Sequence, residues 1–291
     1  MNKLLAFIAV VALCGITQAQ NNILNAKSFE EIGEKTLEQV INDNDKPLPY
    51  GFVGDRDILW ERNTWERIDL DEKINFPLYY PVDTNFVGSN RRSLFHVITK
   101  AAAEGKVNLY ADSYGNTKKN FAEIGSSMKT VDTSDAGITI YNQTGSVPAE
   151  YITTTTVNAN MVKEYRIRGV WYFDSRQGEL KYRMIAIAPV TPDVNFLQDK
   201  EGVELFWVFY PELRGILHEA KVFNEKNSAR PLTFDHLLNS RHFNATIYKI
   251  DNVQGDRYID SYIADNSMMQ LLESERLKET IRNFEIDMWN Y

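Results

Sequence analysis

Alternating apolar and polar positions between Glu164 and Val190 predict a β-hairpin. Two runs of strand-forming residues flank a turn at 175–178, whose glycine allows the positive φ that a short hairpin loop needs. Apolar side chains fall at every second position, at Tyr165, Ile167, Trp171 and Phe173 before the turn and at Leu180, Tyr182 and Met184 after it. From Met184 to Val190 both faces become apolar, which predicts burial on both sides at the centre of a sheet. Pro189 has no N–H for the ladder and is expected to end the second strand.

The other periodic segments predict an α+β fold in a single domain over residues 57–291. Strand patterns occur at 57–81, 107–111, 203–211 and 244–250, and helix patterns at 93–103, 233–238 and 267–289. We therefore expect an antiparallel-rich mixed sheet, with the hairpin at 164–190 in its centre and helices packed against it.

The longest helix pattern lies at the C-terminal end, from about Ser267 to Trp289. Four apolar residues recur there at i, i+4, i+7 and i+11, namely Leu277, Ile281, Phe284 and Met288. This spacing places them in one stripe of an amphipathic helix. Packing of the stripe on the chain's own sheet is the default expectation, and docking on a neighbouring subunit is the alternative.

Two parts of the chain resemble each other in outline. Each has a strand that ends at proline, a loop, a helix that starts at Ser or Thr, and a second strand. The first set comprises 78–81, 93–98 and 107–110, and the second comprises 208–211, 233–238 and 245–248. The pattern leaves two alternatives open: an internal duplication with halves 57–160 and 161–291, or chance similarity of short units.

Two polar stretches predict less regular structure. Residues 20–56 read as an N-terminal arm and linker, with one helical patch started by Ser28 and a partial apolar stripe, and such an arm can become ordered on a partner. Residues 112–159 are rich in Ser, Thr, Asn and Gly, which predicts short surface hairpins or loops. Within them, 132–137 reads as a turn and Thr153 to Thr156 as a polar strand.

The first 19 residues have the pattern of a cleavable signal peptide. A basic start at Lys3 precedes an apolar run from Leu4 to Ile16, and small residues lie at the positions required for cleavage after Ala19. The only cysteine, Cys14, lies inside this apolar run, so the mature chain is expected to have no disulfide. We therefore expect an exported protein whose fold depends on its apolar core.

Charge and hydropathy exclude several classes of function. The chain has 32 basic and 40 acidic residues, a net charge of −8, which argues against general binding to the phosphate backbone of nucleic acid. After the signal peptide, no apolar run approaches the roughly 20 residues of a membrane span. These features predict a soluble protein in the periplasm or outside the cell.

Candidate chemistry is sparse. The four histidines have no metal-ligand spacing, and the chain has no nucleophile elbow, phosphate loop or dinucleotide-binding motif, so no metal, cofactor or nucleophile is predicted. Two carboxylate pairs, Asp69/Asp71 and Asp174/Glu179, could act in glycoside hydrolysis if a cleft held them at the required separation. Basic residues interleave with both pairs, at Arg67, Lys73, Arg176 and Lys181. Ion-paired surface or turn residues are therefore the simpler interpretation.

Several of these segments together resemble the GldN/PorN family, in order from about residue 57 to the C-terminus. They are Trp65–Pro81, Trp171–Asp174 with Ile187–Val190, Leu205–Glu212, Thr233–Leu237 with Arg241–Phe243, and Glu273–Lys278 leading to Asp287–Trp289. Residues 20–56 and 112–160 carry little of the resemblance. Because no catalytic residues are known for that family, none is transferred to this chain.

The resemblance implies a periplasmic component of the type IX protein secretion and gliding-motility machinery. Members of that family assemble with an outer-membrane lipoprotein, GldK/PorK, into rings under the outer membrane, and they contact the periplasmic part of the motor protein GldM/PorM. Two hypotheses follow: a non-enzymatic ring subunit that associates with itself and these partners, or a secreted glycosidase-like hydrolase that uses one of the two carboxylate pairs.

Overall fold

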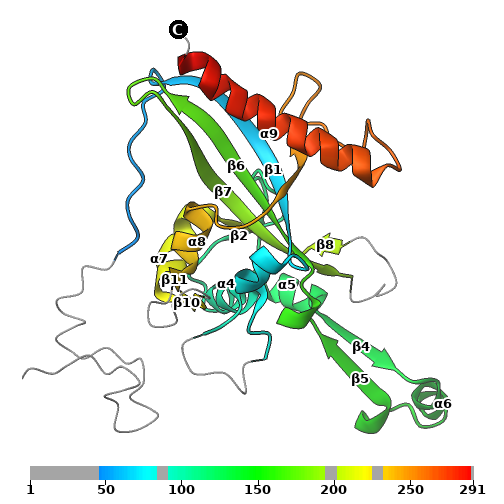
Figure 1. Ribbon diagram of the computed structural model, residues 1–291. Coiled ribbons are helices and arrows are strands. Elements are labelled where there is room, and N and C mark those ends of the chain that lie inside the picture. Colours follow the sequence, from blue (N-terminus) through cyan, green and yellow to red (C-terminus); the bar gives the residue numbers. More distant parts are fainter. Residues whose placement is uncertain (1–45, 84–90, 194–201, 225–231, 290–291) are drawn as a thin grey trace, which may run out of the picture. The chain divides into compact units, whose positions relative to one another are not determined.

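A computed structural model gives the fold for residues 46–83, 91–193, 202–224 and 232–289. The chain divides into two compact units, 1–46 and 47–291. The predicted signal peptide at 1–19 and most of the predicted arm at 20–56 lie outside the described residues, so their predictions stay untested. The strands and helices of the second unit appear in Figure 1.

An eight-stranded antiparallel sheet is the main element of the second unit. Its order is β12-β1-β6-β7-β9-β2-β3, and β8 pairs with β7 beside this path. Its strands are β1 (Ile58–Asp69), β2 (Leu109–Tyr110), β3 (Lys118–Lys119), β6 (Glu164–Asp174), β7 (Glu179–Pro192), β8 (Gly202–Glu204), β9 (Trp207–Phe209) and β12 (Thr246–Ile250). Two further ribbons are separate, β4 (Lys129–Thr133) with β5 (Ile152–Thr156), and β10 (Lys221–Val222) with β11 (Leu232–Thr233). The α+β prediction is confirmed.

The predicted hairpin forms the middle of this sheet as β6 and β7. They are antiparallel from Glu164 opposite Val190 to Asp174 opposite Glu179, and Gly178 in the turn has φ +66°. The end of β7 is buried on both faces, as the sequence predicts. The strand does not end at Pro189, however, but continues to Pro192. Its partner β9 pairs with β7 up to Ile187, and its partner β8 pairs with β7 from Val190 onward. The proline lies between these two partners, where its missing N–H costs no ladder hydrogen bond.

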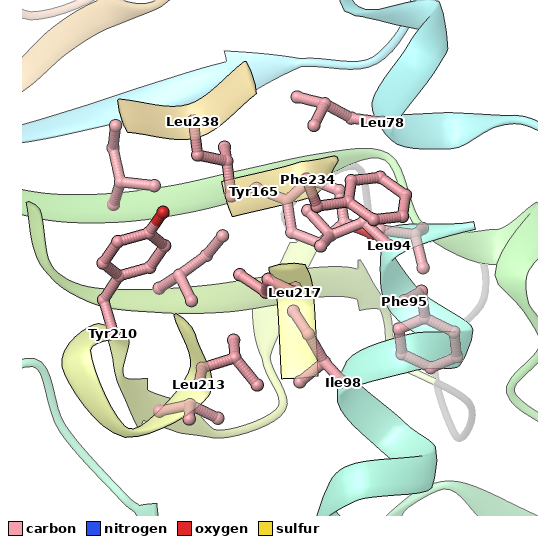
Figure 2. Packing of buried hydrophobic residues seen from close by; sticks show 14 of the residues in the cluster. Leu78, Leu94, Phe95, Ile98, Tyr165, Tyr210, Leu213, Leu217, Phe234 and Leu238 are labelled. Atoms are coloured by element: carbon pink, nitrogen blue, oxygen red, sulfur yellow. The ribbon is translucent and has the colours of Figure 1, made fainter. Parts of the chain in front are cut away.

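Helices cover one end of the sheet and enclose the main core (Figure 2). They are α4 (Leu94–Ala103), α7 (Tyr210–Glu219) and α8 (Phe234–Asn239), with the short α3 (Phe76–Tyr79) and α5 (Phe121–Ser127) beside them. Ser93 and Thr233 cap α4 and α8, because each side-chain oxygen accepts a hydrogen bond from a backbone N–H three residues later. Both helix starts were predicted. The apolar side chains of these helices pack on the inward face of β6 and β7, where Tyr165 and Ile167 are fully buried.

Three predicted segments differ from the structure. Residues 76–79 form α3 instead of strand, because Pro77 is well suited to the first turn of a helix. The predicted strand at 203–211 divides into β8, β9 and the start of α7, where Pro211 again begins a helix. The two parts that resembled each other therefore differ at their first element. The polar region 112–159 contains two helices that its weak apolar pattern did not predict, α5 and α6 (Asp135–Thr144).

The C-terminal helix α9 (Ser267–Trp289) has the predicted bounds. Its Ile281 is buried, and the ring of Phe284 stacks on Trp60 of β1 with their centres 4.6 Å apart. Leu277 packs in the same cluster, with Ile247 of β12. The predicted stripe therefore faces the chain's own sheet. Short 3-10 turns at Lys73–Asn75, Ala149–Tyr151 and Ala159–Met161 complete the described elements.

Candidate functional site

A buried ion pair links the sheet to the end of α8. Glu66 of β1 is 1% exposed, and Arg241 Nη2 donates a hydrogen bond of 2.6 Å to its Oε2. Thr64 Oγ1 donates to the other carboxylate oxygen at 3.2 Å, so both oxygens of Glu66 have partners. The Arg241 guanidinium also lies 4.0 Å from the ring centre of Tyr182. These charges are compensated inside the protein, which makes the pair a structural clamp with no acid or base available for chemistry.

The opposite face of the sheet holds a lysine inside an aromatic cage. The Lys249 ammonium lies 4.5 Å from the ring centre of Trp65, 5.0 Å from that of Tyr114 and 4.9 Å from that of Tyr258. Its Nζ donates a hydrogen bond of 3.0 Å to the Tyr114 hydroxyl. Burial lowers the pKa of Lys249. Aromatic faces attract cations at such distances, so the cage fixes the chain's own side chain and offers no open site.

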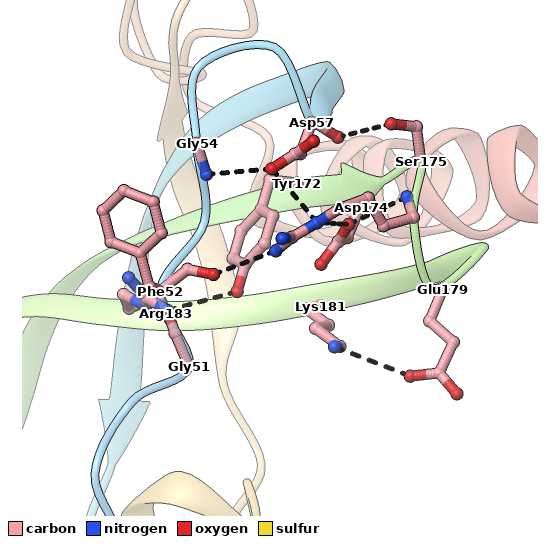
Figure 3. Close-up of polar contacts among 11 residues, drawn as sticks. Gly51, Phe52, Gly54, Asp57, Tyr172, Asp174, Ser175, Glu179, Lys181 and Arg183 are labelled. Carbon is pink, nitrogen blue, oxygen red and sulfur yellow. Dashed lines mark hydrogen bonds and ion pairs between the residues drawn. The ribbon is translucent and has the colours of Figure 1, made fainter.

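Three arginines hold the segment that enters the second unit. Arg214 Nη2 donates to the Leu48 carbonyl at 2.7 Å, Arg183 Nη2 to the Gly51 carbonyl at 3.0 Å, and Arg176 Nη2 to the Phe52 carbonyl at 3.0 Å. Figure 3 shows Gly51 and Phe52 beside the hairpin β6–β7. The predicted extended linker is therefore a strap along β7.

Asp174 and Glu179 lie opposite each other at the hairpin turn, as the sequence suggests, but in different surroundings (Figure 3). Asp174 is 1% exposed and accepts a hydrogen bond of 3.0 Å from the Arg176 backbone N–H. Glu179 has a 61% exposed side chain and pairs with Lys181 at 3.7 Å. One carboxylate thus closes the turn and the other lies in solvent. The geometry gives a hydrolytic pair no support and fits the turn interpretation.

Asp69 and Asp71 also serve local structure. Both are exposed, and the Asp71 N–H donates a hydrogen bond of 2.9 Å to Asp69 Oδ1. An aspartate that accepts from a backbone N–H two residues later forms an Asx turn, which here ends β1. Neither residue lines the three clefts of about 320–350 Å³ that lie elsewhere on the described surface.

Two clefts flank α9. One, of about 350 Å³, lies between the helix, the start of β1 and the 251–262 loop, and has Trp60, Arg257 and Leu277 in its walls. The other, of about 320 Å³, lies between the helix and the β6–β7 hairpin, beside Trp171 and Leu180. A charged residue beside each cleft is engaged with a neighbour: Arg276 bonds Glu273 at 2.6 Å beside the first, and Arg241 bonds Glu66 beside the second. Aromatic and aliphatic walls with satisfied charges are typical of surfaces that receive protein side chains.

The outward side of α9 is unusually apolar at both ends. Near its start Met268 is 67% and Leu272 55% exposed, and near its end Ile286 is 51% and Trp289 69% exposed. Large apolar side chains gathered on one exposed helix commonly mark an interaction surface. We define this α9 surface as Met268, Leu272, Ile286 and Trp289. The inward stripe was predictable from its regular spacing. The outward residues share the opposite helix face by the same spacing, but polar residues such as Glu275 and Glu279 lie between their two pairs, so the sequence does not mark them as one stripe.

Sequence reasoning missed Glu66, Arg241 and Lys249. Isolated charged residues are usually exposed, and these become buried only because segments distant in the chain meet. The one available signal was that Glu66 and Arg241 both lie in segments that carry the family resemblance.

Within the described ranges, no three His, Cys, Asp or Glu side chains are grouped so that they could hold a metal ion. Nor does any helix in the part of the chain that the structure describes combine the length and apolarity needed to cross a membrane.

Comparison with known families identifies one relationship. The model of the family "Gliding motility associated protein GldN" matches residues 53–290. A comparison with curated proteins found no match. The family match covers nearly all of the second unit, so the chain belongs to the GldN family.

Proposed function

We propose that this member of the GldN family is a non-enzymatic structural subunit of a periplasmic ring associated with the outer membrane. In this role it supports protein export by the type IX secretion system and gliding motility. Its partners are further copies of itself, a ring lipoprotein of the GldK/PorK type and the periplasmic part of the motor protein GldM/PorM. Membership of a family of gliding-motility-associated proteins supports the part of this proposal that concerns gliding motility.

The observation that carries the proposal is the exposed α9 surface. The inward stripe of α9 is already packed on the sheet, so this helix does not need its outward apolar residues for folding. A Trp that is 69% exposed at the end of a helix favours contact with another protein, since Trp is enriched at the centres of interfaces.

The interior of the second unit supports a structural role in the same way. Three charged residues are buried, and each has partners inside the protein. Glu66 bonds Arg241, Asp174 accepts a hydrogen bond within the hairpin turn, and Lys249 lies in the aromatic cage. Catalytic groups need an accessible cleft where their protonation can change. Asp174 and Lys249 line neither cleft beside α9, and Glu66, which lines the cleft beside Trp171 and Leu180, has both carboxylate oxygens hydrogen-bonded. No specific observation favours the hydrolase alternative.

Purification from the native cell envelope tests the proposal. A tagged copy should co-purify with the ring lipoprotein and the motor protein in a high-mass assembly, and fractionation should place it in the periplasm without residues 1–19. Leu272→Glu together with Trp289→Ser should remove at least one partner while the far-UV circular dichroism spectrum is unchanged. Glu279→Gln, at an exposed polar position of the same helix, should change nothing. A protein that is strictly monomeric and binds neither partner would refute the proposed role.

A further inference from the structure

β4 and β5 form a two-stranded ribbon outside the large sheet, and α6 joins them (Figure 1). Four of the five β5 residues are exposed, including Ile152, Thr153 and Thr154. An isolated two-stranded ribbon is only marginally stable in water, and a third strand or a packed face is what usually stabilises it. Among the described residues, β5 pairs only with β4.

The hydrogen-bond register shows which backbone groups of β5 point away from β4. The Val157 N–H donates to the Met128 carbonyl at 2.8 Å, and the Ser134 N–H donates to the Tyr151 carbonyl at 3.0 Å. Because bonded and non-bonded pairs alternate in an antiparallel ladder, Thr153 and Thr155 face β4 in the same way. The N–H and C=O groups of Thr154 and Thr156 and the C=O group of Ile152 therefore point to the outer edge, while the Ile152 N–H donates to the Ala149 carbonyl.

The two strands at the ends of the large sheet, β12 and β3, have protected edges. At β12, the Ile247 N–H donates to Ser274 Oγ at 2.8 Å, and the Ile259 N–H donates to the Tyr248 carbonyl at 2.9 Å. The edge strand β3 consists of Lys118 and Lys119, whose charges discourage pairing with another chain.

Beyond Ile152, the outer edge of β5 has no such protection from the part of the chain that the structure describes. Its sequence, Ile-Thr-Thr-Thr-Thr, has no charge, no proline and no glycine, and all five residues are β-branched. This composition favours strand pairing at an exposed edge.

We propose that the outer edge of β5 pairs antiparallel with β5 of a second copy of this chain. This inference rests on the proposed function and specifies one copy–copy contact of the assembly. The net charge of −8 makes two copies repel each other, so a contact is favoured where neither copy presents a carboxylate. β5 meets this condition along its whole length.

A two-fold axis through Thr154 gives a self-complementary register. Thr154 then pairs with Thr154 of the second copy, Thr153 with Thr155, and Ile152 with Thr156. Cross-strand Thr–Thr pairs are favourable, and the outward N–H and C=O groups of Thr154 meet their own counterparts. The two ribbons join into a four-stranded sheet.

Cysteine substitution tests this register. Cys14 is the only native cysteine, so a Cys14→Ser background leaves a chain without thiols. In the proposed pair the two Thr154 Cα atoms lie about 5.5 Å apart, within the range that a disulfide spans. Thr154→Cys should give a covalent dimer when the native assembly is oxidised. Thr153→Cys is the matched control, because the same register separates its two copies by about 8 Å.

Proline substitution tests the backbone contact. Thr154→Pro removes an N–H that points outward, so the β4–β5 ladder keeps its hydrogen bonds and the fold is retained. This variant should lose the Thr154-centred contact, seen as a drop in native mass of the purified assembly. Thr154→Ser, which keeps the N–H, should behave as the wild type.

The outcomes separate this inference from the proposed function. Dimers from Thr154→Cys but not Thr153→Cys, with loss of the contact in Thr154→Pro, support it. An intact assembly with both partners but no Thr154→Cys dimer overturns the β5 contact and leaves the proposed function standing. Cross-linking of Thr154→Cys to a different protein also overturns it. A wild-type protein that is monomeric and binds neither partner overturns both.

Discussion

Arg241 Nη2 lies 2.6 Å from Glu66 Oε2, and this ion pair joins residues 175 positions apart in the chain. It fixes the end of α8 against β1, between the main core and the cluster under α9. Arg241 has φ +50°, a backbone conformation that non-glycine residues adopt infrequently. The pair therefore holds a strained turn at the point where two parts of the unit meet.

Removing one partner of this pair should destabilise the protein strongly, because a buried charge would remain without compensation. We expect Arg241→Gln to lower the free energy of unfolding by about 3 kcal/mol, measured by urea denaturation. Arg276→Gln is a control at the same distance, since Arg276 bonds Glu273 at 2.6 Å but has a 63% exposed side chain. Its cost should be under about 1 kcal/mol. Equal costs for the two variants would contradict the clamp.

Gly169 in β6 should tolerate no side chain. A Cβ at this position would overlap the hydroxyl end of the Tyr182 side chain, which is enclosed by Arg241 and Trp171. We expect Gly169→Ala to cost about 1–3 kcal/mol in urea denaturation. Gly215→Ala provides the contrast, because Gly215 is exposed in α7 with open space around it, and alanine there should stabilise by about 0.5–1 kcal/mol. A neutral Gly169→Ala would show that Tyr182 is free to move aside.

Packing of α9 on the sheet depends on Phe284. Its ring stacks on Trp60 and meets Phe173 edge to face, with centres 6.0 Å apart in the second contact. Phe284→Ala should lower the melting temperature and make α9 the first segment to exchange its amide hydrogens, at a cost of about 2–3 kcal/mol for this half-buried ring. Ile286→Ala, on the exposed side of the same helix, should leave stability within about 0.5 kcal/mol of wild type.

Alkaline pH should weaken the aromatic cage. Burial, and then the hydrogen bond to Asp256, raise the pKa of Tyr114 from 10.0 to about 12. The folded state binds the Tyr114 hydroxyl proton more tightly than the unfolded state does. Protonated Tyr114 therefore stabilises the fold fully below pH 10, and this stabilisation is lost as pH rises toward 12. The difference in phenolate absorbance between wild type and Tyr114→Phe should titrate near pH 12. Asp256→Asn should lower that midpoint, and a midpoint near 10 in the wild type would contradict the cage geometry.

Much of the fold was predictable because it depends on local pattern. The β6–β7 hairpin follows from period-two alternation and the glycine turn, α9 follows from its stripe, and the starts of α4 and α8 follow from their capping residues Ser93 and Thr233. The failures also have local causes. Proline at 77 and 211 began helices where strands were expected, and α6 has too few apolar residues to show a helical period.

The candidate interaction surfaces could be identified only from the tertiary structure. The sequence by itself determined a sheet built around residues 164–190, a long amphipathic C-terminal helix and the absence of recognised catalytic motifs, because these depend on the spacing of neighbouring residues. Only the folded chain decided that Asp174 closes a turn while Glu179 lies in solvent, and that Arg241 reaches Glu66. It also decided that β5, among the described residues, has β4 as its one strand partner. Burial and pairing of these groups depend on which distant segments pack together. The free energy of such tertiary contacts comes from several segments at once and cannot be read from the local pattern of any one of them.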